Sequence, residues 1–286
     1  LDIVYIDKKY YDKIPMIGGF GKEANFRLFL PLLLPNVSKI LYLDCDILCL
    51  GDISTLYNID VSNSPYAAKS EKNFFTLATN PYSKNTFPTL EFFWTLGYDL
   101  FDIDYTNAGV MLVNNDYWRQ HNYVQRSLEF FAKHKQNKNF RFPDQDILNY
   151  LAFQDGSDSR VLFDGKYNIL VSIFPYVFGL NSGIDELSEL DSTDFRCNFL
   201  MKLLSIDNFD KSFQPVIVHY AGPKPWNGQA AIYNKVYQEY SLKIGWDIRL
   251  CNAKKIAKYN ITKSNIKKTI KYMLPYGVVR YLQKRK

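Results

Sequence analysis

The feature that most constrains the fold is a series of short apolar runs, each of strand length, separated by segments with helical periodicity. The strand-like runs occupy residues 2–6, 39–43, 66–69, 109–113 and 216–218. The helical segments occupy residues 22–34, 114–135 and 229–243, and a further short helix opens at Pro143. Strands that alternate with helices predict an α/β fold with a mostly parallel sheet. We expect one such domain over residues 1–250.

Charge is divided unevenly along the 286 residues. Residues 254–286 carry eleven Lys and Arg and no Asp or Glu, whereas the 24 basic residues of 1–253 face all 29 acidic ones, a net charge of −5. This balance excludes a nucleic-acid-coating role for the body, because such binding needs positive charge over the binding face. The four cysteines show no paired spacing, which is typical of a reduced, cytosolic protein.

The basic segment 251–286 interleaves its charges with apolar and aromatic residues. A basic amphipathic helix of this kind favours an anionic membrane surface, and Pro275 and Gly277 should divide it into two pieces. A solvated, frayed helix is the alternative interpretation. Since no apolar run reaches the roughly 18 residues of a membrane span, we expect a peripheral attachment.

Polar residues gather at the ends of three predicted strands, where open α/β sheets bind their ligands. Asp44-Cys45-Asp46 directly follows the run 39–43, Asn107 lies just before the run 109–113, and His219 ends the last strand. Two carboxylates at a strand end suit Mn²⁺ or Mg²⁺, which also take diphosphate oxygens. For the motif by itself, a solvated turn with a capping Asp is the simpler interpretation; at the end of an apolar strand, the two interpretations are equally good.

His219 opens the block His-Tyr-Ala-Gly-Pro-Lys-Pro-Trp over residues 219–226. An imidazole could complete a carboxylate-bound cation, and it is a better ligand for Mn²⁺ than for Mg²⁺. Lys224 could offset negative charge on a leaving phosphate. Taken alone, a hydrogen-bonded turn histidine and a surface lysine remain the simpler interpretation.

Four blocks in a fixed order carry a resemblance to a known family. They are LYLDCD at 41–46, NAGVMLVN at 107–114, DQDILN at 144–149 and HYAGPKPW at 219–226. Together they resemble glycosyltransferase family 8, the bacterial lipopolysaccharide galactosyl- and glucosyltransferases and their glycogenin relatives. The resemblance covers roughly residues 1–245.

The resemblance implies a GT-A fold, a Rossmann-like nucleotide-diphospho-sugar domain that transfers a hexose from a UDP-sugar with retention. On this basis Asp44, Asp46 and His219 would bind Mn²⁺, with Mg²⁺ as the alternative, and Gly222 and Lys224 would hold the phosphates. The residues that would line the rest of the donor site are Arg27, Cys45, Asn107, Ala108, Asp144 and Gln145.

Charge develops on the β-phosphate as the glycosidic bond breaks, which is why a Lewis acid and a cation suit this reaction. We expect front-face attack by the acceptor, with the Gln145 amide stabilising the oxocarbenium face. A covalent intermediate on Asp144 is the alternative, by analogy with retaining glycosidases.

Two departures from the family pattern are visible. One residue separates Gly222 from Lys224 where the family usually has two, and roughly 50–60 residues of a first βαβ unit are expected to precede the matching region. We expect a hexosyltransferase on the inner face of the cytoplasmic membrane that acts on lipopolysaccharide or another lipid-linked cell-surface glycan. The alternatives are a protein-acceptor transferase and a catalytically dead sugar- or partner-binding derivative.

Overall fold

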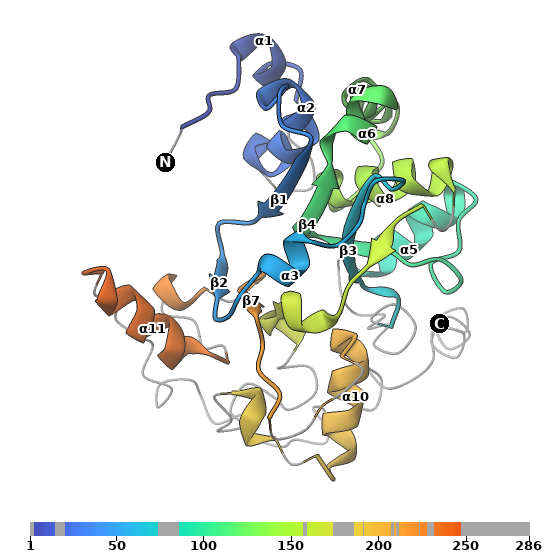
Figure 1. Ribbon diagram of the computed structural model, residues 1–286. Coiled ribbons are helices and arrows are strands. Elements are labelled where there is room, and N and C mark those ends of the chain that lie inside the picture. The colour runs from blue at the N-terminus through green and yellow to red at the C-terminus, as the bar shows by residue number, and fades with distance from the viewer. Residues whose placement is uncertain are drawn as a thin grey trace, which may run out of the picture. The chain divides into compact units, whose positions relative to one another are not determined.

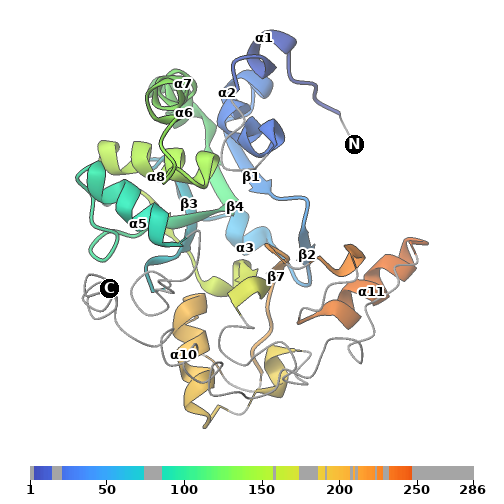
Figure 2. The same ribbon diagram turned by 180° about the vertical axis from the view of Figure 1, so that it is seen from behind.

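The chain forms two compact units in a computed structural model (Figures 1 and 2). The model describes residues 3–14, 21–73, 86–156, 159–173, 186–190, 192–206, 209, 212–222, 224–227 and 232–246. Unit 1 comprises Leu1–Leu43, Leu56–Phe75 and Pro81–Phe163. Unit 2 comprises Asp44–Thr55, Thr76–Asn80 and Asp164–Lys286. The short helix α3 (Ser54–Tyr57) carries residues of both.

Unit 1 contains a four-stranded sheet in the order β1-β4-β3-β5. Its strands are β1 (Lys39–Leu43), β3 (Tyr66–Ser70), β4 (Thr106–Asn114) and β5 (Val161–Leu162). β4 runs antiparallel to both of its neighbours, whereas β3 and β5 pair in parallel. Residues 110–113 of β4 are at most 1% exposed, so this strand forms the centre of the core.

Helices cover the sheet of unit 1. They are α1 (Lys8–Tyr11), the 3-10 helix η1 (Lys22–Phe29), α2 (Leu30–Leu33), α5 (Thr86–Thr95), α6 (Asn115–Gln120), α7 (Tyr123–His134) and α8 (Pro143–Asp155). α8 packs against β4 (Figures 1 and 2). Phe92 and Phe93 of α5 reach Phe130 of α7 and Phe153 of α8, with ring centroids 5.9 and 5.6 Å apart. These aromatic contacts join three helices into one layer.

Unit 2 is built on a three-stranded sheet in the order β2-β7-β6. Its strands are β2 (Ile47–Cys49), β6 (Ile169–Leu170) and β7 (Ile217–His219). β7 is buried and pairs antiparallel with β2 and parallel with β6. The helices of this unit are η2 (Gly165–Tyr167), η3 (Val171–Ile173), η4 (Leu187–Glu189), α10 (Phe195–Leu204), η5 (Pro225–Asn227) and α11 (Asn234–Lys243).

The predicted α/β class is confirmed, but the prediction of a mostly parallel sheet is wrong. Three of the five strand pairings among the described residues are antiparallel. The backbone N–H of Glu71 donates to the carbonyl of Tyr105 at 2.6 Å, across the end of β3 and the start of β4. This bond joins the end of β3 to the start of β4, so β4 runs beside β3 in the opposite direction.

Three local predictions also change. Residues 3–6 form no strand, since among the described residues no strand pairs with them, and Ile3 and Tyr5 are 71% and 82% exposed. The helix expected over 114–135 is two helices, α6 and α7, separated at Asn122, whose φ of 54° is left-handed. Asn107 lies inside β4 rather than before the strand.

The domain boundary predicted at residue 250 and the basic tail beyond it lie outside the described residues. In the part of the chain that the structure describes, no helix is both long enough and apolar enough to span a bilayer.

Candidate functional site

Three side chains of unit 2 form an acid–histidine cluster, which we define as Asp44, Asp46 and His219. β2 pairs with β7 so that Ile47 faces His219, and the N–H of Tyr220 donates to the carbonyl of Asp46 at 2.8 Å. This pairing brings the Asp-x-Asp turn against the end of β7. Nε2 of His219 lies 3.2 Å from Asp46 Oδ1 and 3.7 Å from Asp44 Oδ2.

The cluster has the donor set of a divalent-cation site. One ligand atom from each of its three residues lies within 4.8 Å of the others. Oδ1 of Asp46 is buried and accepts no hydrogen bond from the described residues. Carboxylate oxygens and an imidazole nitrogen suit Mn²⁺. The residues therefore fit the metal that the sequence predicted.

A buried amide fixes the ring of His219. Nδ1 of His219 lies 3.0 Å from Oδ1 of Asn168, and both side chains are buried. Because an amide oxygen can only accept, Nδ1 donates to it, and Nε2 is the ring nitrogen that faces the carboxylates. Metal-binding histidines commonly gain this support from a partner on the second nitrogen. No sequence motif pointed to Asn168.

Lys224 is the cation nearest the cluster among the described residues. It forms an ion pair with Oδ2 of Asp46 and donates to the carbonyl of Tyr220 at 2.7 Å. Burial would raise the pKa of Asp46, but His219 and Lys224 outweigh it and hold the pKa well below its usual range. Asp46 is therefore ionised throughout the neutral range, as metal binding requires.

Gly222 belongs to the same unit and has a φ of +102°. A Cβ at this position would also lie 3.2 Å from Cβ of Ser172. The turn after β7 thus favours glycine for two reasons: its positive φ is strained for other residues, and a Cβ would crowd Ser172. The expected role of Gly222 and Lys224 in phosphate binding stays a prediction.

Unit 1 holds the residues expected around the donor sugar. Nε of Arg27 lies 2.9 Å from Asp144 Oδ2, and the Arg27 guanidinium also donates to the carbonyl of Ala108. The guanidinium lies over the ring of Tyr42, 4.5 Å from its centroid. Pro143 begins α8 and so places Asp144 in its first turn. Arg27 therefore links η1, β4 and α8.

The amide of Gln145 is held on both sides. Its Oε1 accepts from Nδ2 of Asn107 at 3.1 Å and from the N–H of Ala108 at 3.0 Å. Its Nε2 donates to the hydroxyl of Tyr105 at 3.1 Å. That hydroxyl donates to Asp146 at 2.5 Å. The Asn-Ala motif at 107–108 and the Asp-Gln motif at 144–145, which are 37 positions apart, thus meet through one side chain.

Asp146 was not expected to take part in the site. It is fully buried, and its Oδ2 accepts from the N–H groups of Arg141 and Phe142 at 3.2 and 3.1 Å. Burial, the largest influence, raises the pKa of Asp146 to about 7. The signal that could have found it is the Asp-x-Asp at 144/146, whereas nothing in the sequence distinguished Tyr105.

The predicted site residues thus fall into two groups. The group in unit 2 is Asp44, Cys45, Asp46, His219, Gly222 and Lys224, of which Cys45 is exposed. The group in unit 1 is Arg27, Asn107, Ala108, Asp144 and Gln145.

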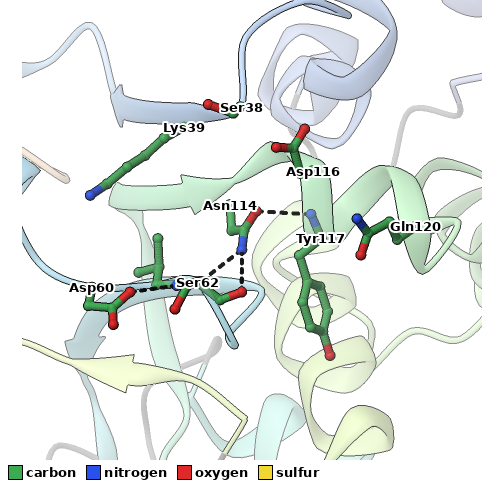
Figure 3. A pocket seen from close by; sticks show the side chains of 9 residues that line it. Ser38, Lys39, Asp60, Ser62, Asn114, Asp116, Tyr117 and Gln120 are labelled. Carbon is green, nitrogen blue, oxygen red and sulfur yellow. Dashed lines mark hydrogen bonds between the residues drawn. The ribbon is translucent and has the colours of Figure 1, made fainter.

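A separate pocket in unit 1 has a volume of about 390 Å³ (Figure 3). Asn114 in its wall caps α6 through the N–H of Tyr117 at 2.9 Å, and its Nδ2 donates to the carbonyls of Val61 and Ser62. These bonds cap the start of α6 and tie the junction between β4 and α6 to residues 61–62. None of the predicted site residues lines this pocket.

Comparisons with known proteins agree with the fold. The structure resembles that of the galactosyltransferase LgtC with a TM-score of 0.58 and 20% identity, covering 84% of this chain and 74% of LgtC. The chain therefore has the α/β GT-A fold that the sequence predicted. The family model for glycosyl transferase family 8 matches residues 5–230, and the chain belongs to this family.

Two curated bacterial relatives are similar to shorter parts of the chain. A putative glycosyltransferase of Haemophilus influenzae is 32% identical over 123 residues, 43% of this chain and 33% of that protein. The lipopolysaccharide glucosyltransferase WaaO of Escherichia coli is 26% identical over 204 residues, 68% of this chain and 46% of that protein. The chain thus spans less than half the length of either relative.

Proposed function

We propose that the protein is a retaining glycosyltransferase that moves a galactosyl or glucosyl group from a UDP-hexose to a glycan. The observation that carries this proposal is the acid–histidine cluster in a chain of glycosyl transferase family 8. Asp44, Asp46 and His219 would hold Mn²⁺, or Mg²⁺ in its place, against the diphosphate. A cation bound there supplies Lewis-acid stabilisation of the charge that develops on the leaving UDP.

The remaining residues of unit 2 would act on the phosphates. Lys224 already pairs with Asp46 and carries the positive charge that a diphosphate needs. A cation on Asp46 would compete with this ion pair, which frees the ammonium group for a phosphate oxygen. Gly222 would let the backbone approach that oxygen closely, because it carries no Cβ.

The residues of unit 1 would bind the sugar. In this assignment Arg27, Asn107 and Ala108 line the sugar pocket, and the Gln145 amide stabilises the oxocarbenium-like carbon while the acceptor attacks from the front face. The ion pair of Asp144 with Arg27 at 2.9 Å supports this choice, because a carboxylate engaged by a guanidinium is a weaker nucleophile. A glycosyl adduct on Asp144, detected by mass spectrometry, would refute front-face attack.

The acceptor that we propose is a lipid-linked glycan such as lipopolysaccharide. Two similar proteins support a glycan acceptor. WaaO is named a lipopolysaccharide glucosyltransferase, and LgtC was solved in complex with donor and acceptor sugar analogues. The eleven basic residues of 254–286 support a peripheral position on the anionic inner face of the cytoplasmic membrane.

The test is UDP release from UDP-galactose and UDP-glucose with Mn²⁺ present. We expect turnover of one donor, and a loss of roughly 100-fold or more in Asp44→Ala, because the cation loses a ligand. Asp52→Ala is the matched control, since Asp52 is an exposed carboxylate eight positions later that contacts Ser54. Equal turnover by Asp44→Ala and wild type would exclude the proposed cation site, and binding without any turnover would favour the sugar-binding derivative.

A further inference from the structure

Unit 1 contains a relay of three side chains, which we define as Gln145, Tyr105 and Asp146. Hydrogen bonds of 3.1 Å and 2.5 Å connect them in that order. Tyr105 and Asp146 are both fully buried, whereas Gln145 is partly exposed. The relay therefore runs from the proposed sugar pocket into the core.

The direction of every hydrogen bond in the relay follows from its ends. The N–H of Ala108 can only donate, so the atom of Gln145 that faces it at 3.0 Å is the oxygen. The nitrogen of the same amide must then face the Tyr105 hydroxyl and donate to it. That leaves the hydroxyl proton for Oδ1 of Asp146, which accepts it.

The inner end of the relay is fixed in place. Oδ2 of Asp146 accepts two backbone N–H groups, from Arg141 and Phe142, at the start of α8. The Tyr105 ring packs edge-on against Phe93 with centroids 5.4 Å apart. Since these contacts fix both the Asp146 carboxyl group and the Tyr105 ring, the lone pair of the Tyr105 hydroxyl faces Gln145 in a single orientation. Networks of this kind strengthen their members, because each bond polarises the next.

We propose that Tyr105, anchored by Asp146, is a positioning residue that holds the Gln145 carboxamide in the orientation used for sugar transfer. This inference rests on the transferase function proposed above. Without the hydroxyl, Nε2 of Gln145 loses its acceptor in the relay, and the amide is held only from the side of Ala108 and Asn107. The carboxamide would then spend part of the time outside the orientation used for transfer.

A purely structural role is the competing explanation, because Asp146 also closes the first turn of α8. Tyr105→Phe separates the two, since it keeps the packed ring and removes one hydroxyl. Tyr66→Phe is the matched control. Tyr66 is equally buried and lies in β3 of the same unit, and its hydroxyl shares a hydrogen bond of 3.1 Å with Oγ1 of Thr106; no hydrogen bond among the described residues links that hydroxyl to Gln145.

The experiment is steady-state kinetics with the UDP-hexose that the wild type uses. We expect Tyr105→Phe to lower kcat roughly 10- to 100-fold while the donor KM changes less than about 3-fold, because positioning matters most in the transition state. Tyr66→Phe should keep kcat within about 2-fold of wild type. In a Gln145→Ala background, Tyr105→Phe should cause no further loss, since the group it positions is gone.

Two results would overturn the inference: a wild-type kcat in Tyr105→Phe, or the same loss in the Gln145→Ala background as in wild type. If Tyr105→Phe does not fold by circular dichroism, Asp146→Asn serves in its place, with the same expected dependence on Gln145. A wild-type protein that turns over no UDP-hexose would instead reject the transferase function itself. An active wild type with an unaffected Tyr105→Phe would reject only the relay.

Discussion

Arg27 and Asp144 form an ion pair inside unit 1, and breaking it should cost more than any surface ion pair of the chain. The two side chains are 7% and 11% exposed, with Nε and Oδ2 2.9 Å apart. Arg27→Met keeps the length of the side chain but leaves a carboxylate buried beside an apolar group. Removing one partner of a buried pair costs about 3–5 kcal/mol. We expect a loss of this size in the free energy of unfolding.

Urea denaturation followed by circular dichroism measures this loss. Arg196→Met is the control, because Arg196 pairs with Asp194 at the surface with 48% of its side chain exposed, and it should cost less than about 1 kcal/mol. Adding Asp144→Asn to Arg27→Met removes the buried charge and should return about 2 kcal/mol. A cost below about 1 kcal/mol for Arg27→Met, or no recovery in the double variant, would refute the reasoning.

Three further predictions concern the two groups of site residues. Asn168→Ala should weaken Mn²⁺ binding about 10- to 100-fold, because the His219 ring loses the partner that orients it; isothermal titration with Mn²⁺ checks this, and an unchanged affinity would contradict it. Burial raises the pKa of Asp146 from 3.8 to about 7, so the folded state binds this proton more tightly than the unfolded chain. Protonated Asp146 therefore stabilises the fold fully below about pH 4, and this stabilisation is lost as the pH rises to about 7. Melting temperatures measured against pH should show this loss in the wild type and not in Asp146→Asn. The same pH dependence in both proteins would count against the assignment. Gly222→Ala should lower the free energy of unfolding by about 1–3 kcal/mol, because a left-handed φ is strained for alanine; denaturation curves that coincide with wild type would disagree with that.

The sequence was sufficient for the fold class because strands and helices leave local patterns. The runs 39–43 and 109–113 are apolar, and both are strands. The direction of a strand depends instead on where the chain returns. β4 returns antiparallel to β3, and the hydrogen bond between Glu71 and Tyr105 at this return joins residues 34 positions apart. No local sequence pattern encodes such a contact.

Some residues of the candidate site could likewise be predicted from local sequence patterns, and others could not. Asp44 and Asp46 come after an apolar strand and His219 ends another, so their approach to one another could be predicted from strand-end chemistry. Asn168 and Tyr105 carry no such signal. Asn168 contacts His219 and Tyr105 contacts Gln145, and each of these partners is 40 or more positions away in the sequence. Only the folded chain brings the partners together, so neither residue differs in the sequence from an ordinary buried one.

The central claim is that the acid–histidine cluster holds the divalent cation through which the protein binds its sugar nucleotide. Isothermal titration of the wild type and of His219→Ala with UDP, in Mn²⁺ and in EDTA, tests it most directly. We predict that the wild type binds UDP in Mn²⁺ at least about 10-fold more tightly than in EDTA, and that His219→Ala loses this difference. Equal UDP affinity in Mn²⁺ and EDTA for the wild type would contradict the claim.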